Sequence, residues 1–177
     1  MTDPVQFMSH HTAVEYSLPE PSRLGVHFAV QLGRGKIIGH RCPQCAKVYV
    51  PPRGYCPLCV VETTDADEVS IADRGTITTF SVITPLQYPG QQETEDYVQA
   101  TLLLDGSDTT LMVTGLEGIA IADVRTGLRV EAVWAPDGER GAAAVGVRGM
   151  GLGDAVKGWR PTGEPDLPRE QLAEHVL

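Results

Sequence analysis

The four cysteines of this chain form two C-x-x-C pairs, Cys42-Pro43-Gln44-Cys45 and Cys56-Pro57-Leu58-Cys59, with ten residues between them. Two residues between cysteines allow both sulfurs of a pair to reach the same metal ion, and two such pairs complete a closed tetrahedral site. Thiolates are soft ligands that suit Zn²⁺. We therefore predict one structural zinc ion per chain, bound by Cys42, Cys45, Cys56 and Cys59.

Two other uses of these cysteines are weighed against zinc. A rubredoxin-like iron centre would use the same thiolate ligands. Two disulfide bonds would require an oxidising compartment, but the N-terminus shows neither the basic region nor the apolar region of a signal peptide. We therefore expect a cytoplasmic protein with reduced thiols. A membrane role is not expected either, because no apolar run approaches the roughly 18 residues that a membrane helix needs.

The charges are distributed unevenly along the chain. The net charge of −9 disfavours nucleic-acid binding, which normally requires a basic surface. Nevertheless, no Asp or Glu occurs between Glu20 and Glu62, while six basic residues do: Arg23, Arg34, Lys36, Arg41, Lys47 and Arg53. A zinc ion with four thiolates is formally −2, so two nearby cations would balance it. The remaining cations are in excess of that need.

The spacing of apolar residues and the positions of Pro and Gly divide the chain into four parts. Residues 1–21 form an extended arm, residues 22–65 a helix plus the zinc ribbon, residues 66–161 a β-rich domain, and residues 162–177 a flexible tail. Ser22 can cap the helix, whose apolar residues Leu24, Phe28 and Leu32 recur at helical spacing. A ribbon of about 25 residues has almost no core of its own, so the metal should supply most of its folding energy.

The β-rich domain shows five candidate strands. The first, Gly75–Thr84, changes its apolar alternation near Thr78-Thr79, which predicts a bulge there. Residues 98–104 and 111–113 alternate on either side of an Asp105-Gly106-Ser107-Asp108 turn, residues 128–134 alternate again, and residues 142–148 are expected as the last strand. An irregular connector at residues 118–125 precedes the fourth strand. The fold class is therefore mainly β: an N-terminal helix and rubredoxin-like zinc ribbon followed by a five-stranded OB-fold barrel. We expect this barrel to unfold as a separate unit, since its core does not include the cysteines.

No catalytic constellation stands out in the sequence. A G-x-S-x-G nucleophile motif is absent, and a closed four-cysteine site leaves no free cysteine and no open metal position for water. His27 is expected on the helix surface, and His40 beside the zinc turn or at the surface. Tyr49 and Tyr55 either pack within the ribbon or contact a partner. We therefore expect no catalytic activity from this chain alone.

The sequence HRCPQCAKVYVPPRGYCPLC, followed by DRGTITTFSVI, LLLDGSDT and GLRVEAVW, resembles a known family. The family consists of zinc-ribbon/OB-fold proteins associated with acyl-CoA, and the resemblance runs from about residue 22 to residue 161. Where zinc knuckles often have glycine after the second cysteine, this chain has Ala46 and Val60. A Cβ in a left-handed conformation costs about 1–2 kcal/mol, but the ligands are unaffected.

The resemblance implies a small accessory subunit of a thiolase-like enzyme, closest to partners of lipid-transfer-protein-type aldolases that cleave steroid side-chain CoA thioesters. Zinc would then be structural, and the CoA thioester would be a ligand shared with the partner. Arg41, Lys47 and Arg53 flank the ribbon turns, so we expect them to contact either the CoA phosphates or the partner. The alternative is a free-standing zinc-ribbon/OB module that binds single-stranded nucleic acid or protein, which would need exposed aromatic side chains on the barrel.

Overall fold

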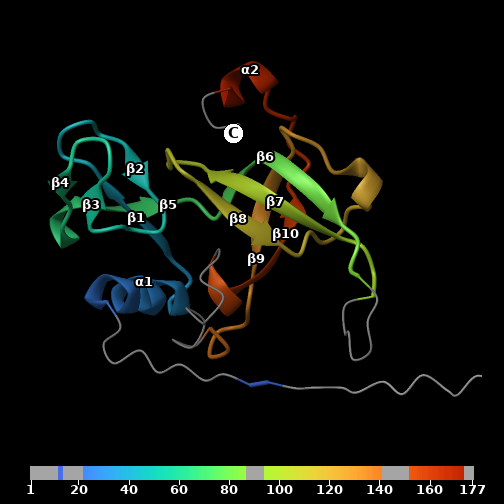
Figure 1. Cartoon of the computed structure of the whole chain (residues 1–177), viewed down its shortest axis with the longest axis horizontal. Coiled ribbons are helices and arrows are strands. Elements are labelled where there is room, and N and C mark those ends of the chain that lie inside the picture. The colour runs from blue at the N-terminus through green and yellow to red at the C-terminus, as the bar shows by residue number, and fades with distance from the viewer. Residues whose placement is uncertain (1–11, 14–21, 87–93, 141–151, 174–177) are drawn as a thin grey trace, which may run out of the picture.

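The first element of the protein is helix α1 (Arg23–Gly33), which begins as the sequence predicts (Figure 1). In this computed structural model, which describes residues 12–13, 22–86, 94–140 and 152–173, Ser22 Oγ accepts a hydrogen bond of 2.9 Å from the Gly25 amide. Phe28, Ala29 and Leu32 are buried on the inner face of the helix. The capped start and the apolar stripe together dock α1 against the strands that follow.

The ribbon contains five short strands in two sheets: β1 (Ile37–Arg41), β2 (Val48–Tyr49), β3 (Tyr55–Cys56), β4 (Val61–Glu62) and β5 (Glu68–Ile71). Strands β2, β1 and β5 form one antiparallel sheet, and β3 pairs with β4 in a small hairpin. A 3₁₀ turn, η1 (Asp65–Asp67), leads into β5 and is capped by Thr64. Strand β5 therefore completes the ribbon sheet, although the sequence placed residues after 65 with the barrel.

The second sheet contains five longer strands: β6 (Arg74–Ile83), β7 (Tyr97–Leu104), β8 (Thr110–Thr114), β9 (Arg129–Trp134) and β10 (Val156–Pro161). Their order is β10-β9-β6-β7-β8, and every neighbouring pair is antiparallel. The edges close because the chain after β8 runs parallel to β10, where Glu117 N donates to Trp159 O at 2.8 Å and Trp159 N donates to Gly115 O at 2.9 Å. This closure confirms the OB-type barrel.

Strand β6 contains the predicted bulge. Its register with β7 shifts between Ile77 and Thr79, and Thr78, at that shift, is completely buried. The hydroxyls of Thr78 and Thr79 each lie 2.6 Å from Thr101 Oγ1 on β7. The bulge therefore lets Ile77 before it and Phe80 after it both reach the core, although they have opposite parity, whereas Val82 is 45% exposed.

The fifth strand and the C-terminal segment differ from expectation. Residues 142–148, predicted as the last strand, lie outside the described residues. The fifth strand of the described sheet is β10, which was not among the candidate strands of the sequence. Residues 162–173 belong to the expected flexible tail, yet they pack on the barrel. Leu167 N donates to Gly127 O at 2.9 Å, and α2 (Arg169–Leu172) buries Leu172 to 1% exposure. The sequence features that indicate β10 and α2 are the apolar residues Trp159 and Leu172. They were overlooked because Gly, Pro and charged residues surround them.

The ribbon and the barrel share one hydrophobic core. A single cluster of buried residues includes Phe28, Ile37 and Val48 from the ribbon side and Leu102 and Trp159 from the barrel. Strand β2 also meets the β7–β8 turn directly, because Asp108 N donates to Val48 O at 2.9 Å and Val48 N donates to the Asp108 carboxylate at 2.8 Å. In Figure 1 the ribbon strands lie beside the barrel with α1 beneath them. The barrel core is therefore not separate from the ribbon.

A buried arginine fixes the rest of the β7–β8 turn. Arg129 on β9 is 9% exposed and donates to both carboxylate oxygens of Asp105, at 2.7 and 2.5 Å. It also donates to Thr76 Oγ1 at 2.8 Å and to Glu164 at 3.2 Å. The hydrogen bonds to Asp105, the largest effect, raise the pKa of Arg129 further above its usual value.

Among the described helices, none is long and apolar enough to cross a membrane.

Candidate metal centre

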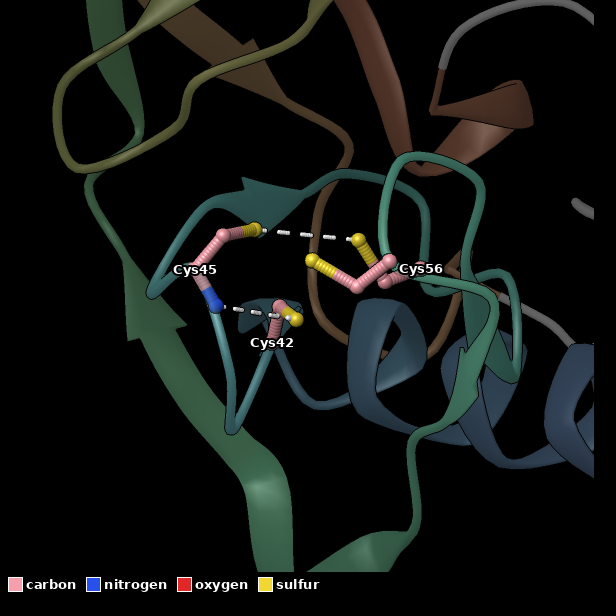
Figure 2. A group of neighbouring side chains, drawn as sticks. Cys42, Cys45 and Cys56 are labelled. Carbon is pink, nitrogen blue, oxygen red and sulfur yellow. Dashed lines mark hydrogen bonds between the residues drawn. The ribbon is translucent and has the colours of Figure 1, made fainter.

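The four cysteine sulfurs converge at the end of the ribbon. All four Sγ atoms lie within 4.8 Å of one another, and Cys45 and Cys56, from different knuckles, are 3.7 Å apart (Figure 2). A tetrahedral ion with Zn–S bonds of about 2.3 Å would place its sulfurs about 3.8 Å apart. A disulfide would need about 2.05 Å, and all four cysteines are free. The predicted ligand set is therefore a zinc-ribbon site, and the disulfide alternative does not describe this fold.

Each pair of cysteines lies on a tight turn, or knuckle, of the same design. The amide of Ala46 donates to Cys42 O at 3.0 Å, and the amide of Val60 donates to Cys56 O at 2.8 Å. Ala46 and Val60 have φ angles of 62° and 56°, so both turns keep the left-handed conformation in spite of the cost of a Cβ there. The amides of Gln44 and Cys45 also point at Cys42 Sγ, each at 3.4 Å. This geometry orients both sulfurs of each pair toward one ion.

Hydrogen bonds prepare Cys56 to act as a thiolate. Burial would raise its pKa, but the Tyr49 hydroxyl and the backbone N–H groups of Cys59 and Leu58 outweigh burial and lower the pKa to about 6. The Tyr49 oxygen lies 3.3 Å from Cys56 Sγ, and its interaction with that sulfur raises the pKa of the phenol. A hydrogen bond with Cys45, followed by burial, raises the pKa of Cys59 to about 12. A divalent cation would relieve this competition between neighbouring thiols for negative charge.

The three predicted cationic contacts lie around the site. Arg41 and Lys47 flank the first knuckle, where Cys42 N donates to Lys47 O at 2.8 Å, and Arg41 is exposed. The exposed Arg53 guanidinium lies over the Tyr49 ring, 5.8 Å from its centroid. The structure thus brings Arg53 to the ring that contacts a zinc ligand. No direct contact joins the three cations in the described part of the chain.

Most of these cations have no carboxylate partner. Of the six basic residues in the acid-free segment, Arg23 alone forms an ion pair within the described residues, with Asp65 at 3.0 Å. The others, Arg34, Lys36, Arg41, Lys47 and Arg53, form none there. By contrast, the basic residues described elsewhere, apart from Arg169, are all paired with Asp or Glu. The excess of positive charge predicted from the sequence is therefore unbalanced on the ribbon.

His27 and His40, the two histidines among the described residues, have structural positions. His27 Nε2 lies 2.6 Å from a carboxylate oxygen of Glu68, which connects α1 to β5, and both side chains are about one-third exposed. His40 is 1% exposed, and its Nδ1 lies 3.1 Å from Thr63 Oγ1. Because Thr63 is also buried, a substrate has no access to this pair. Tyr49 packs within the ribbon, whereas Tyr55 is 53% exposed.

Comparison with protein-family models gives two matches in the order of the fold. Residues 31–63 match the model described as "ChsH2, rubredoxin-like zinc ribbon domain", and residues 68–135 match "ChsH2, C-terminal OB-fold domain". Together the two matches cover more than half of the chain and include all four cysteines. The OB-fold match begins with β5, although the structure pairs this strand with β1 of the ribbon.

Three individual relatives agree with these matches. A "DUF35 domain-containing scaffold protein" from Methanocaldococcus jannaschii is 28% identical over 115 residues, which are 63% of this chain and 79% of that protein. A DUF35-family crystal structure of unknown function from Sulfolobus solfataricus has a TM-score of 0.52 at 24% identity, over 63% of this chain and 78% of the other. A solved structure of an "Ltp2-ChsH2(DUF35) aldolase" has a TM-score of 0.54 at 21% identity, over 81% of this chain and 98% of the other. The two solved structures share the fold of this chain.

Proposed function

Because this chain belongs to the DUF35 family of zinc-ribbon/OB-fold proteins, we propose that it is the accessory subunit of a thiolase-like enzyme. The enzyme would be of the lipid-transfer-protein type and would act on acyl-CoA thioesters, by retro-aldol cleavage of a steroid side chain. This chain would help to assemble the cytoplasmic complex and to hold CoA, while the partner would supply the catalytic residues.

The observation that supports this proposal most directly is the match of both domains, in order, to models described as ChsH2. The aldolase complex whose fold this chain shares carries the same name, and the archaeal relative is described as a scaffold protein. A subunit that supports another enzyme fits these descriptions. The acyl chain of the substrate is our extension from the family resemblance.

The chemistry of the described residues agrees with a supporting role. Four thiolates close the metal site, so no position is open for a catalytic water. The His40–Thr63 pair is buried, and His27 is engaged by Glu68. When bound, the zinc ion would hold the two knuckles together, because the hairpin β3–β4 has little apolar core of its own.

Arg41, Lys47 and Arg53 provide the proposed contact with CoA. The pyrophosphate and 3′-phosphate of CoA require cationic partners. Arg41 and Arg53 are exposed, Lys47 is partly exposed, and none of the three has an ion pair within the described residues. Arg53 is also held over the Tyr49 ring, which limits its freedom before a ligand binds. These three residues would clamp the nucleotide end at the mouth of the partner's active site.

Substitution of Arg53 tests the contact and the function together. In the assembled complex, Arg53→Glu should raise the KM for a CoA thioester several-fold, and the effect should shrink for a pantetheine thioester, which lacks the nucleotide. Arg169→Glu is the matched control, since Arg169 is also exposed and has no ion pair in the described residues. It should leave both KM values unchanged.

Two outcomes would contradict the proposal. An equal loss with both substrates, or loss of assembly, would assign Arg53 to the protein interface and leave the phosphates to the other subunit. Full activity and stability of the thiolase-like enzyme without this chain would refute the role of an accessory subunit altogether.

A further inference from the structure

We propose that the barrel turn between β7 and β8 positions a zinc ligand in each knuckle of the ribbon, through strand β2. Asp108 acts on Cys42 in the first knuckle. Thr109 acts on Cys56 in the second knuckle. The metal centre then depends on two positioning residues from a part of the chain that contributes no ligand. This inference goes beyond the proposed function, because it needs neither a partner enzyme nor CoA.

The turn takes the place of a missing strand beside β2. Strand β2 has only two residues and lies at the edge of its sheet, so the backbone groups on its outer side need other partners. Asp108 N donates to Val48 O at 2.9 Å, and the Asp108 carboxylate accepts from Val48 N at 2.8 Å. The Thr109 hydroxyl accepts from Val50 N at 3.0 Å and donates to Val50 O at 3.3 Å. In Figure 1 the tip of the β7–β8 hairpin points toward β2.

Water cannot replace these hydrogen bonds. Val48 is 2% exposed and Val50 is 1% exposed, so an amide that lost its partner would be left buried and unpaired. The turn is itself held in shape, because Ser107 Oγ accepts from Thr109 N at 3.1 Å and donates to Thr109 O at 2.9 Å. The barrel therefore fixes the position of β2 from its outer side.

The first connection to the metal centre runs through the peptide unit between Lys47 and Val48. Its carbonyl, that of Lys47, accepts a hydrogen bond of 2.8 Å from Cys42 N. Its N–H, that of Val48, donates to the Asp108 carboxylate at the other end of the same unit. Two hydrogen bonds on one peptide unit strengthen each other, because each polarises the unit further. The Asp108 carboxylate therefore helps to hold the backbone of Cys42 in place.

The second connection runs through Tyr49, which lies between the two residues that the turn holds. The Tyr49 hydroxyl is 3.3 Å from Cys56 Sγ, and the residue is 4% exposed. The Thr109 hydroxyl fixes the backbone directly after Tyr49, at Val50. A shift of that backbone would move the long tyrosine side chain and take its hydroxyl away from the sulfur. Groups that orient metal ligands in this way commonly change metal retention when they are removed.

Removal of the Thr109 hydroxyl tests the second connection. In the full-length zinc-loaded chain, Thr109→Val should make transfer of zinc to a chromogenic chelator about fivefold faster, because Tyr49 is no longer held. Thr109→Ser keeps the hydroxyl and should restore the wild-type rate. Thr78→Val is the control for stability, since it removes a buried hydroxyl that lies 2.6 Å from Thr101 Oγ1 within the barrel. It should leave the transfer rate unchanged.

Combination with Tyr49→Phe shows whether Thr109 acts through Tyr49. Thr109→Val should add almost nothing to the transfer rate of Tyr49→Phe, because the hydroxyl that Thr109 positions is already absent. Cobalt bound in place of zinc gives a second measurement. The thiolate-to-cobalt charge-transfer absorption should shift in the same direction in Thr109→Val and Tyr49→Phe, and should not shift in Thr78→Val.

Asp108 tests the first connection. Asp108→Ala should also speed zinc transfer several-fold, whereas Asp108→Asn keeps an acceptor oxygen for Val48 N and should stay near the wild-type rate. Because Asp108 acts through Cys42, the effect of Asp108→Ala should multiply with that of Tyr49→Phe. Asp108 is exposed, so this pair of variants gives a result even where Thr109→Val yields no folded protein.

Two results would overturn the proposal. One is a wild-type rate of zinc transfer in both Thr109→Val and Asp108→Ala. The other is a Thr109→Val effect that persists in full beside Tyr49→Phe with an unchanged cobalt spectrum, because the turn would then only join the barrel to the ribbon. Since no partner enzyme is present in these measurements, neither result bears on the proposed function.

Discussion

The hydroxyl group of Tyr49 connects the metal site to the cation that we propose for CoA. It lies 3.3 Å from Cys56 Sγ, while the ring below it supports the Arg53 guanidinium at 5.8 Å. Tyr49 is 4% exposed, so water cannot replace its hydrogen bond to the sulfur. A hydrogen bond to a metal-bound thiolate withdraws charge from the sulfur and holds it in place.

Removal of this hydroxyl should therefore loosen the zinc ion. Tyr49→Phe keeps the ring and loses only the O–H···S contact, so transfer of zinc to a chromogenic chelator should become about tenfold faster. Tyr55→Phe is the matched control, because Tyr55 is exposed and its hydroxyl forms no hydrogen bond to a zinc ligand within the described residues. Equal transfer rates for the two variants would show that the Tyr49 hydroxyl is only a packing group.

At the level of single residues, the sequence predicted those features that depend on local residue spacing. The four ligands and the left-handed residues Ala46 and Val60 follow from the C-x-x-C pattern itself, because each turn closes within five residues. The role of Tyr49 and the burial of Arg129 depend on which strands lie side by side. Arg129 alternates with apolar residues as a surface residue would, and only Asp105, Thr76 and Glu164, distant in sequence, make its burial possible.

At the level of secondary-structure elements, the two sheets of the ribbon differ in the interactions that stabilise them. Strands β1 and β5 carry Ile37, Ile38 and Ile71 into the common core. The hairpin β3–β4 instead packs on a small cluster of Cys42, Tyr49 and Cys56 with Cys59 and Val61. The metal therefore stabilises one half of the ribbon much more than the other, and the expectation that zinc supplies most of the ribbon's folding energy applies to the knuckles.

Loss of zinc should accordingly melt the knuckles alone. Elemental analysis should find one zinc per chain, and a chelator or Cys56→Ser should remove it. Hydrogen exchange should then accelerate in residues 42–47 and 54–63, while β1 and β5 stay protected. Stoichiometric iron, or loss of protection throughout β1 and β5, would contradict this prediction.

The strands of the barrel show where pattern reading succeeds and fails. The bulge in β6 was predictable because a change of parity in one strand is visible in the sequence alone. Strand β10 was missed because Val156–Pro161 has only two fully buried residues, Gly158 and Trp159, according to its burial pattern. Its position is set by pairing with β9 and by closure against residues 115–117, which the sequence of a short strand does not encode locally.

For the whole molecule, the shared core revises the expectation of a barrel that unfolds by itself. Ile37→Ala, at a site 1% exposed in the ribbon sheet, should destabilise the zinc-loaded protein by about 2–5 kcal/mol, the usual cost of such a cavity. The fluorescence of the buried Trp159 should report the same transition as a ribbon probe. Val61→Ala, which touches only the metal cluster, should leave that transition nearly unchanged. Two separate transitions with Ile37→Ala affecting only one would restore the independent barrel.

The connection between β5 and β6 consists of only Ala72 and Asp73. Ala72 N donates to Asp105 O at 3.3 Å, and Ala132 N donates to Asp73 O at 2.7 Å, so even these two residues are attached to the barrel. The ribbon and the barrel therefore form one rigid unit and are not two domains on a flexible linker. The distance and angle between the zinc site and the barrel are fixed before a partner binds, so an enzyme that contacts both must be complementary to that spacing.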